Sequence, residues 1–239
     1  MDYDSFLELV KKRRSIRRFK TDPVPDEYID KIIEAARWSP SGFNLQPWEF
    51  VVVRDQKLKD GIVQIIKESN VNTSKMEIAR ESWQVKPRSI APPRPSTGPV
   101  NDYTQAPVYI ILFGDTRTNV GLPMGRRYDY PLMQGAFLSG LASAFLYMQL
   151  AATSLGLASQ WVSAAANPYG HCLVKKLLGV PHELEAYDMM AVGYPDGEPG
   201  PRIVRDKEEM VHYDYCDGNT FRSEEAVKDF IIKIRNPHG

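Results

Sequence analysis

Cysteine and histidine are scarce in this sequence, and those present form no metal-binding or disulfide pattern. The two cysteines, Cys172 and Cys216, and the four histidines share no spacing typical of metal ligands. We therefore expect neither a disulfide framework nor a metal site. No Gly-x-Gly-x-x-Gly motif follows a strand-like segment, which argues against a separate nicotinamide-binding domain. The sequence opens with acidic residues and not with a basic and apolar leader, so we expect a reduced, cytoplasmic protein.

A strong net charge is also missing, because 30 basic residues balance 30 acidic ones. Neither a polyanionic partner nor a membrane surface is implied by this balance. One segment, residues 130–170, carries no charge at all, so a membrane-spanning helix must be considered there. It is interrupted by small and polar residues, namely Gln134, Gly135, Ser139, Gly140, Ser143, Gln149, Thr153 and Ser154. We therefore expect a buried core or interface helix and no membrane contact.

Apolar residues at helical spacing predict five helices. Ser5 and Glu8 form a capping-box pattern, so the first helix should run from about residue 6 to 15. The second should follow Pro25 and stop at the turn that begins with Ser39. The other three are predicted at residues 58–67, 131–155 and 223–234.

Four β-branched or apolar runs predict strands at residues 49–54, 107–114, 159–164 and 189–194. The strands and helices follow one another without a repeat or a linker, so one domain is expected over residues 1–239. Residues 70–105 are polar and then proline-rich, which predicts a lid or an excursion, although a tolerated surface insertion fits equally well. Residues 213–239 should form an extension that packs away from its own core.

Seven cations crowd into the segment from Lys11 to Lys20. The dipole at a helix C-terminus attracts one or two cations, each contributing about 0.3 to 1 kcal/mol, and so does not explain seven. Paired guanidinium groups with a serine hydroxyl suit a phosphate, because both can donate charge-assisted hydrogen bonds to it. A solvated basic face and a nucleic-acid patch are the alternatives. Only one aromatic residue, Phe19, is interleaved with the cations and no series of them suited to base stacking is present, which disfavours nucleic acid.

A second notable segment is Ser39-Pro40-Ser41-Gly42-Phe43-Asn44-Leu45-Gln46-Pro47-Trp48, between a predicted helix and a predicted strand. Loops in this position often carry binding residues. Asn44 and Gln46 offer amide groups that can recognise the edge of a heteroaromatic ring, and Gly42 permits close approach of the backbone. A purely structural turn is the alternative at this point.

Together the two segments resemble the signature of the nitroreductase family. Arg-Arg-Ser-Ile-Arg at residues 13–17 precedes the Ser-Pro-Ser-x-x-Asn-x-Gln-Pro-Trp turn by some two dozen residues. The later order is similar as well: an Ala-Pro strand at 106–114, a long apolar helix, Gln160-Trp161-Val162, and Gly193-Tyr194-Pro195. The resemblance spans nearly the whole chain. It implies an α+β fold with a mixed, mainly antiparallel central sheet flanked by helices, and a homodimer with the long helix at its interface.

The resemblance also implies two FMN sites, each built from both chains. Arg13 and Ser15 would hold the FMN phosphate, Arg14 would contribute its backbone, and Arg17 would lie near the pyrimidine end as an electrostatic tuner of the flavin. The flavin ring would meet a turn from the other subunit, formed by Pro40, Ser41, Gly42 and Asn44. Flavin N5 would face the strand end formed by Gln160, Trp161, Val162 and Ser163.

Two features depart from the family pattern. The stretch around Arg202 and Arg205 lacks the usual adjacent pair of cations followed by proline, so the sequence does not identify which of them would close on the phosphate. Residues 70–105 show no recognisable family motif, and substrate choice would depend on that region.

The resemblance thus implies an FMN-dependent oxidoreductase that passes electrons from NAD(P)H to a nitroaromatic, a quinone or an activated alkene. Donor and acceptor would alternate at one flavin site, and no acid or base residue is strictly required. The alternatives are flavin cleavage or reductive dehalogenation on a similar fold. From another class, a nucleic-acid-binding protein would use Lys11 to Lys20.

Overall fold

The computed structural model describes residues 2–79, 103–200, 202–216, 218 and 221–235. It divides into two compact units. The first unit comprises Met1–Lys75 with Asn101–Glu198, and the second comprises Met76–Val100 with Pro199–Gly239. Most of the lid predicted at 70–105 lies outside the described residues. The predicted division into one domain, a lid and a C-terminal extension stays a prediction.

A four-stranded sheet organises the first unit, with strand order β1-β2-β4-β3. The strands are β1 (Trp48–Val53), β2 (Val108–Asp115), β3 (Ala158–Val162) and β4 (Leu184–Gly193). The three named pairings are antiparallel. Among the described residues, the one parallel contact is a bridge between Ser15 and Ser159. The predicted α+β class with a mixed, mainly antiparallel sheet is therefore confirmed, and β4 begins five residues earlier than expected.

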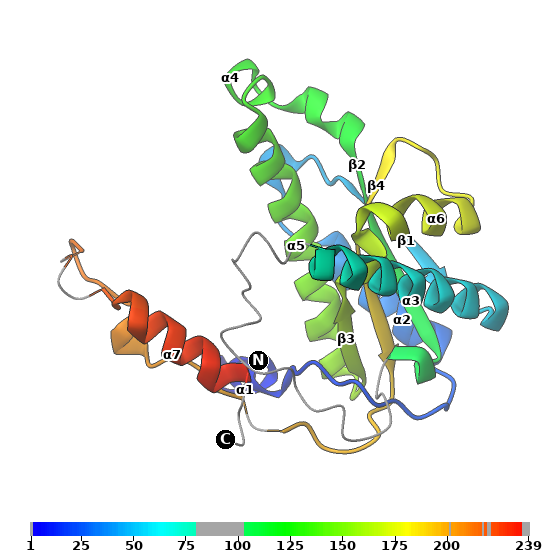
Figure 1. Ribbon diagram of the computed structural model, residues 1–239, viewed down its shortest axis with the longest axis horizontal. Coiled ribbons are helices and arrows are strands. Elements are labelled where there is room, and N and C mark those ends of the chain that lie inside the picture. The colour runs from blue at the N-terminus through cyan, green and yellow to red at the C-terminus, as the bar shows by residue number, and fades with distance from the viewer. Residues whose placement is uncertain (1, 80–102, 201, 217, 219–220, 236–239) are drawn as a thin grey trace. The chain divides into compact units, whose positions relative to one another are not determined.

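Helices cover both faces of this sheet (Figure 1). On one face, α2 (Asp26–Arg37) and α5 (Tyr130–Ser154) pack on Val108, Ile110 and Leu112 of β2. On the other face, α3 (Gln56–Ala79) and α6 (Pro168–Leu178) pack on the alternate β2 residues, which include Ile111. Both faces of β2 are buried because successive strand residues point to opposite sides of the sheet.

The helix α5 is the uncharged helix expected from the sequence. Asp129 caps it by accepting a hydrogen bond from the Leu132 amide at 3.2 Å. Its inner side packs closely on the sheet: a Cβ added to Gly114 would lie only 2.3 Å from the ring of Phe137. By length and composition alone α5 could cross a membrane, and 44% of its most apolar window is buried inside the structure.

The first helix differs from the prediction. The helix α1 spans Tyr3–Lys12, and its cap is Asp2, whose carboxylate accepts a hydrogen bond from the Ser5 amide at 2.8 Å. The capping box predicted at Ser5 is therefore wrong, and so is the predicted helix end at residue 15. The chain leaves the helix at Arg13 because the Ile16 amide donates to the Ser159 carbonyl of β3 at 3.0 Å. A strand-like hydrogen bond thus replaces the last helical turn.

Two further helices differ from the prediction, and the remaining elements are short. The helix α3 extends twelve residues beyond its predicted end, and α6 was not predicted. The remaining elements of the first unit are η1 (Gly42–Asn44), η4 (Tyr103–Gln105), η5 (Thr116–Gly121), α4 (Met124–Arg127) and η6 (Ser163–Ala166). The second unit contains η7 (Lys207–Glu209) and α7 (Glu224–Arg235), and α7 is close to the predicted helix at 223–234.

Candidate functional site

The turn between α2 and β1 has an unusual backbone. Phe43, Asn44 and Gln46 have φ angles of 54°, 54° and 46°, in the left-handed region that residues other than glycine rarely adopt. Each such residue costs of order 1 to 3 kcal/mol, and such strain concentrates at binding and catalytic sites. The Ser41 hydroxyl supports the turn by accepting a hydrogen bond from the Gln46 amide at 3.0 Å. The turn is therefore held in one conformation and presents Phe43, which is exposed.

Two glycines, Gly140 on α5 and Gly42 in the turn, let the helix and the turn pack closely. A Cβ on Gly140 would lie 3.1 Å from the Ser41 Cβ, and a Cβ on Gly42 would lie 3.2 Å from the Ala136 Cβ. Both distances are shorter than ordinary carbon contacts, so the close approach depends on the missing side chains. Pro40, Ser41, Gly42 and Asn44 thus form one surface feature beside the N-terminal half of α5.

The basic segment lies at the edge of β3. Ser15 forms the parallel bridge with Ser159, and the chain continues past the end of β4, where the Lys20 amide donates to the Tyr194 carbonyl at 2.9 Å. Arg13 and Arg14 are half-buried, whereas Ser15 and Arg17 are exposed. The predicted phosphate residues therefore adjoin the predicted N5 strand, although their FMN roles stay predictions.

Two buried polar atoms beside this segment, Ser159 Oγ and Gln160 Oε1, have no hydrogen-bond partner within the described part of the chain. Ser159 is only 2% exposed. An unsatisfied buried polar group costs about 1 to 3 kcal/mol, so a native structure rarely leaves two neighbours unpaired unless a further group completes them. Successive strand residues point to opposite faces of the sheet, so one ligand edge can complete only one of the two atoms. A ligand with a hydrogen-bond donor on its edge, such as the pyrimidine of a flavin, fits Gln160 Oε1, because an amide oxygen only accepts.

The rest of β3 is built around a buried carboxylate. The Trp161 indole N–H donates to Asp188 of β4, and the Trp161 ring packs on Phe145 with 4.1 Å between centroids. Val162 is buried on the opposite face, and Ser163 is exposed where β3 gives way to η6. Asp188 is 8% exposed, and burial raises its pKa above the ordinary aspartate value.

Within one chain, the turn and the basic segment lie at opposite ends of the sheet. The turn enters β1 at Trp48, which pairs with Gly114, and Gly114 pairs with Glu185. The basic segment bridges Ser159, which pairs with Val192. Glu185 and Val192 are seven residues apart on β4, which corresponds to about 23 Å. One chain therefore does not bring the two predicted halves of the FMN site together.

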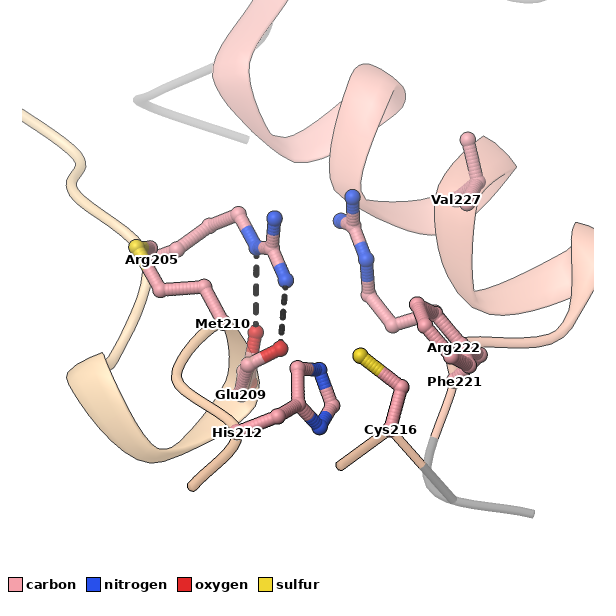
Figure 2. A pocket seen from close by; sticks show the side chains of 8 residues that line it. All are labelled: Arg205, Glu209, Met210, His212, Cys216, Phe221, Arg222 and Val227. Carbon is pink, nitrogen blue, oxygen red and sulfur yellow. Dashed lines mark hydrogen bonds and ion pairs between the residues drawn. The ribbon is translucent and has the colours of Figure 1, made fainter. Parts of the chain in front are cut away.

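The two candidate phosphate arginines lie in the second unit. Arg202 is exposed, whereas Arg205 is half-buried and lines a cavity of about 350 Å³ (Figure 2). The Arg205 guanidinium donates to the Glu209 carboxylate at 3.4 Å and to the Glu209 carbonyl at 2.8 Å. The Arg222 guanidinium approaches from the other side, and its buried Nη1 has no hydrogen-bond partner among the residues that the structure describes. Which arginine reaches a phosphate stays untested.

Three buried charged residues among those described escaped the sequence reasoning. The first is Asp188, for which the only signal in the sequence was an acidic residue directly before Met189-Met190-Ala191-Val192. The second is Lys59, which is 6% exposed and whose ammonium donates to the carbonyls of Ala106 at 3.1 Å and Pro107 at 3.2 Å. The third is Lys175, whose ammonium donates to the His182 carbonyl at 2.8 Å. Burial lowers the pKa of Lys59. Among the described residues, no cluster of acidic, histidine or cysteine side chains is arranged to hold a metal.

Comparison with known proteins supports the same family. A relative from Rattus norvegicus, iodotyrosine deiodinase 1, is 38% identical over 209 residues, which cover 86% of this chain and 67% of the relative. A Methanothermobacter thermautotrophicus protein, named provisionally as an NADH dehydrogenase/NAD(P)H nitroreductase, is 26% identical and covers 85% of this chain and 84% of its own. A crystal structure of an iodotyrosine deiodinase bound to FMN and 3-iodo-L-tyrosine has a TM-score of 0.63 at 25% identity, covering 88% of this chain and 99% of that chain. The model of the Nitroreductase family matches residues 10–194, and the chain belongs to that family.

Proposed function

We propose that this protein binds FMN and transfers electrons from NAD(P)H to a small organic acceptor. The observation that supports this function best is the unsatisfied buried Oε1 of Gln160 on β3, whose neighbour Ser159 is bridged to Ser15 of the Arg13–Arg17 segment. A flavin edge would supply a donor to this oxygen, and the adjacent cations suit its phosphate. The FMN-bound deiodinase structure adds support, because it shares the fold over 88% of this chain.

In this proposal, each of these segments has a separate role in binding FMN. Arg13 and Ser15 hold the phosphate, with the backbone of Arg14 beside them, and the exposed guanidinium of Arg17 faces the pyrimidine edge. Gln160 and its neighbours on β3 contact the reacting edge of the ring. When bound, FMN supplies hydride transfer, and the chain supplies position, electrostatics and exclusion of water.

The same proposal requires a homodimer. Because the sheet end that the turn enters lies about 23 Å along β4 from the Ser159 end, a second chain would provide the turn that completes each site. The outer side of α5 is uncharged and includes the exposed leucines Leu132, Leu138 and Leu146. An exposed apolar stripe of this kind is typical of an interface between subunits.

Reductive dehalogenation is the second candidate, because the rat deiodinase is 38% identical to this chain. Both reactions use the same flavin site, so the acceptor decides between them. The lid or excursion was predicted at residues 70–105, and its residues 80–102 lie outside the described structure.

A panel of acceptors tests the two candidates. FMN-loaded protein is mixed under anaerobic conditions with NADH or NADPH, and then with a nitroaromatic, a quinone or 3-iodotyrosine. We expect NAD(P)H-driven turnover of the nitroaromatic or the quinone. Reduction by dithionite but not by NAD(P)H, together with iodide release from 3-iodotyrosine, would replace the reductase proposal with the dehalogenase.

A further inference from the structure

The second unit contains a cavity of about 350 Å³ that the proposed function does not explain (Figure 2). Small-molecule sites in proteins usually measure about 300 to 1,000 Å³, so this cavity has room for a compact ligand. The described side chains that line it all belong to the second unit: Arg205, Glu209, Met210, His212, Cys216, Phe221, Arg222 and Val227.

Two guanidinium groups lie on opposite sides of this cavity, and one carboxylate is present to balance them. Arg205 is the paired one: it donates to the Glu209 carboxylate at 3.4 Å and to the Glu209 carbonyl at 2.8 Å. No carboxylate of the described residues pairs with Arg222, whose guanidinium lies 5.4 Å from the centre of the Phe230 ring. The described lining therefore carries one uncompensated positive charge.

The Arg222 guanidinium is well placed to bind an anion. Its contact with Phe230 uses the face of the guanidinium and leaves the N–H groups in its plane available for hydrogen bonds. Nη1 is buried without a partner among the described residues, so water does not solvate the charge on that side. A poorly solvated charge attracts an opposite charge more strongly, because the effective dielectric around it is lower. An anion in the cavity would compensate this charge.

The other walls of the cavity are aromatic and apolar. The rings of His212 and Phe221 stack with 5.1 Å between their centroids and 28° between their planes. Met210 and Val227 add apolar surface. A flat ring suits such walls because aromatic faces pack well in an offset stack. The lining thus combines one site for a negative charge with a surface for a ring.

We propose that this cavity binds a small aromatic carboxylate, a single-ring monoanion such as benzoate. Its carboxylate accepts two parallel hydrogen bonds from Arg222, and its ring lies against His212 and Phe221. One negative charge matches the one uncompensated cation. A phosphate dianion fits less well, because it brings a second negative charge into the cavity that Glu209 already lines. This inference does not depend on the proposed function.

Calorimetric titration of the full-length protein with four probes tests the charge and the ring separately. Benzoate is compared with benzamide, which keeps the ring without the charge, with acetate, which keeps the charge without the ring, and with inorganic phosphate. Benzoate should bind about 10-fold or more tightly than each of the others. Benzamide that binds as tightly as benzoate, or phosphate that binds more tightly, would overturn the proposal.

Three variants test the residues. Arg222→Gln should weaken benzoate binding by about 10- to 10²-fold, the effect of losing hydrogen bonds to a charged group, and leave benzamide binding unchanged. Glu209→Gln should tighten the binding of both benzoate and phosphate, because it removes the opposing charge and releases Arg205. Lys228→Gln is the control, since Lys228 also carries a positive charge on α7 but is paired with Glu224 at 2.7 Å and does not line the cavity. Arg222→Gln that binds benzoate like the native protein would contradict the assignment.

The two cysteines give a readout that locates the ligand. Both are free and exposed, but Cys216 lines the cavity whereas Cys172 lies on α6 of the first unit. At a benzoate concentration five times its dissociation constant, alkylation of Cys216 by iodoacetamide should slow by about sixfold, because only the free fraction reacts. Alkylation of Cys172 should not change. Peptide mass spectrometry measures both rates, and equal rates at Cys216 with and without benzoate would place the ligand elsewhere.

Repeating the titration with FMN present separates this site from the flavin site. Arg205 is one of the two arginines that the sequence offers to the FMN phosphate, so FMN itself is the rival occupant of the cavity. We expect benzoate to bind equally well with and without FMN. Competition between the two, or loss of FMN in Arg222→Gln, would assign the cavity to the FMN phosphate and overturn the proposal. Protein that binds benzoate but no FMN would leave this site standing and remove the proposed function alone.

Discussion

The uncharged side of α5 allows a quantitative prediction about assembly. Leu132, Ser139 and Leu146 recur every seven residues and so lie on one stripe of the helix. Leu132 is 46% exposed and Leu146 is 43% exposed. If this stripe is the dimer interface, the double variant Leu132→Ala with Leu146→Ala should weaken the dimer.

The exposed fractions give the expected size of the effect. Full burial of a leucine contributes about 1.5 to 3 kcal/mol, so covering the exposed part of both side chains contributes about 1.3 to 2.7 kcal/mol per chain. In a twofold dimer both subunits contribute the same two leucines to the interface, so the total contribution is roughly 3 to 5 kcal/mol for the dimer. The dissociation constant should therefore rise by about 10² to 10⁴.

Sedimentation equilibrium measures this change, and FMN absorbance recorded in the same runs reports cofactor loss. We expect FMN to leave as the dimer dissociates, because each site needs a turn from the second chain. Val120→Ala removes another exposed apolar side chain, one on η5, and serves as the control. A double variant that dimerises like the native protein would refute the assignment of this stripe, and a monomer that retains all its FMN would refute the two-chain site.

Three further predictions concern single residues. Arg13→Ala should weaken FMN retention by about 1.5 to 3 kcal/mol, the range for hydrogen bonds to charged groups, and leave riboflavin affinity unchanged in fluorescence titrations; equal weakening of both ligands would remove Arg13 from the phosphate. Arg17→Gln should lower the midpoint potential of the bound flavin by a few tens of mV, since at about 4 Å and an effective dielectric near 20 the attraction has a ceiling of about 4 kcal/mol, or about 90 mV. A redox titration in which Arg17→Gln and Arg18→Gln both match the native potential would contradict that role. Burial lowers the pKa of Lys59 in the folded state, so the unfolded chain binds more protons, and the native protein should gain stability as pH rises through the window below the ordinary lysine value. Urea unfolding should show this gain in the native protein and not in Lys59→Met.

The sequence predicted the layered core well because hydrophobic periodicity determines it. The apolar runs became β1 and β2, and the charge-free segment became α5 within one residue at each end. Helix ends were less predictable. The basic segment continues the helical pattern up to Ser15, yet its backbone pairs with Ser159, which lies far away in the sequence. Such long-range hydrogen bonds leave no local signal.

The candidate site could be predicted only in part for a similar reason. The turn and the basic segment were identified from their residue types, but their separation on the sheet follows from strand order and register. Asp188 was missed because a single acidic residue within a hydrophobic run predicts an interruption or a strand end. Its burial became evident only once Trp161 was placed beside it.

Anaerobic reduction of the purified dimer by NAD(P)H tests the central claim most directly. The protein should be yellow, should release FMN on denaturation, should lose its flavin absorbance when NADH or NADPH is added, and should regain it when a quinone or a nitroaromatic follows. Colourless protein after expression with added riboflavin, or bound FMN that neither nicotinamide reduces, would contradict the account.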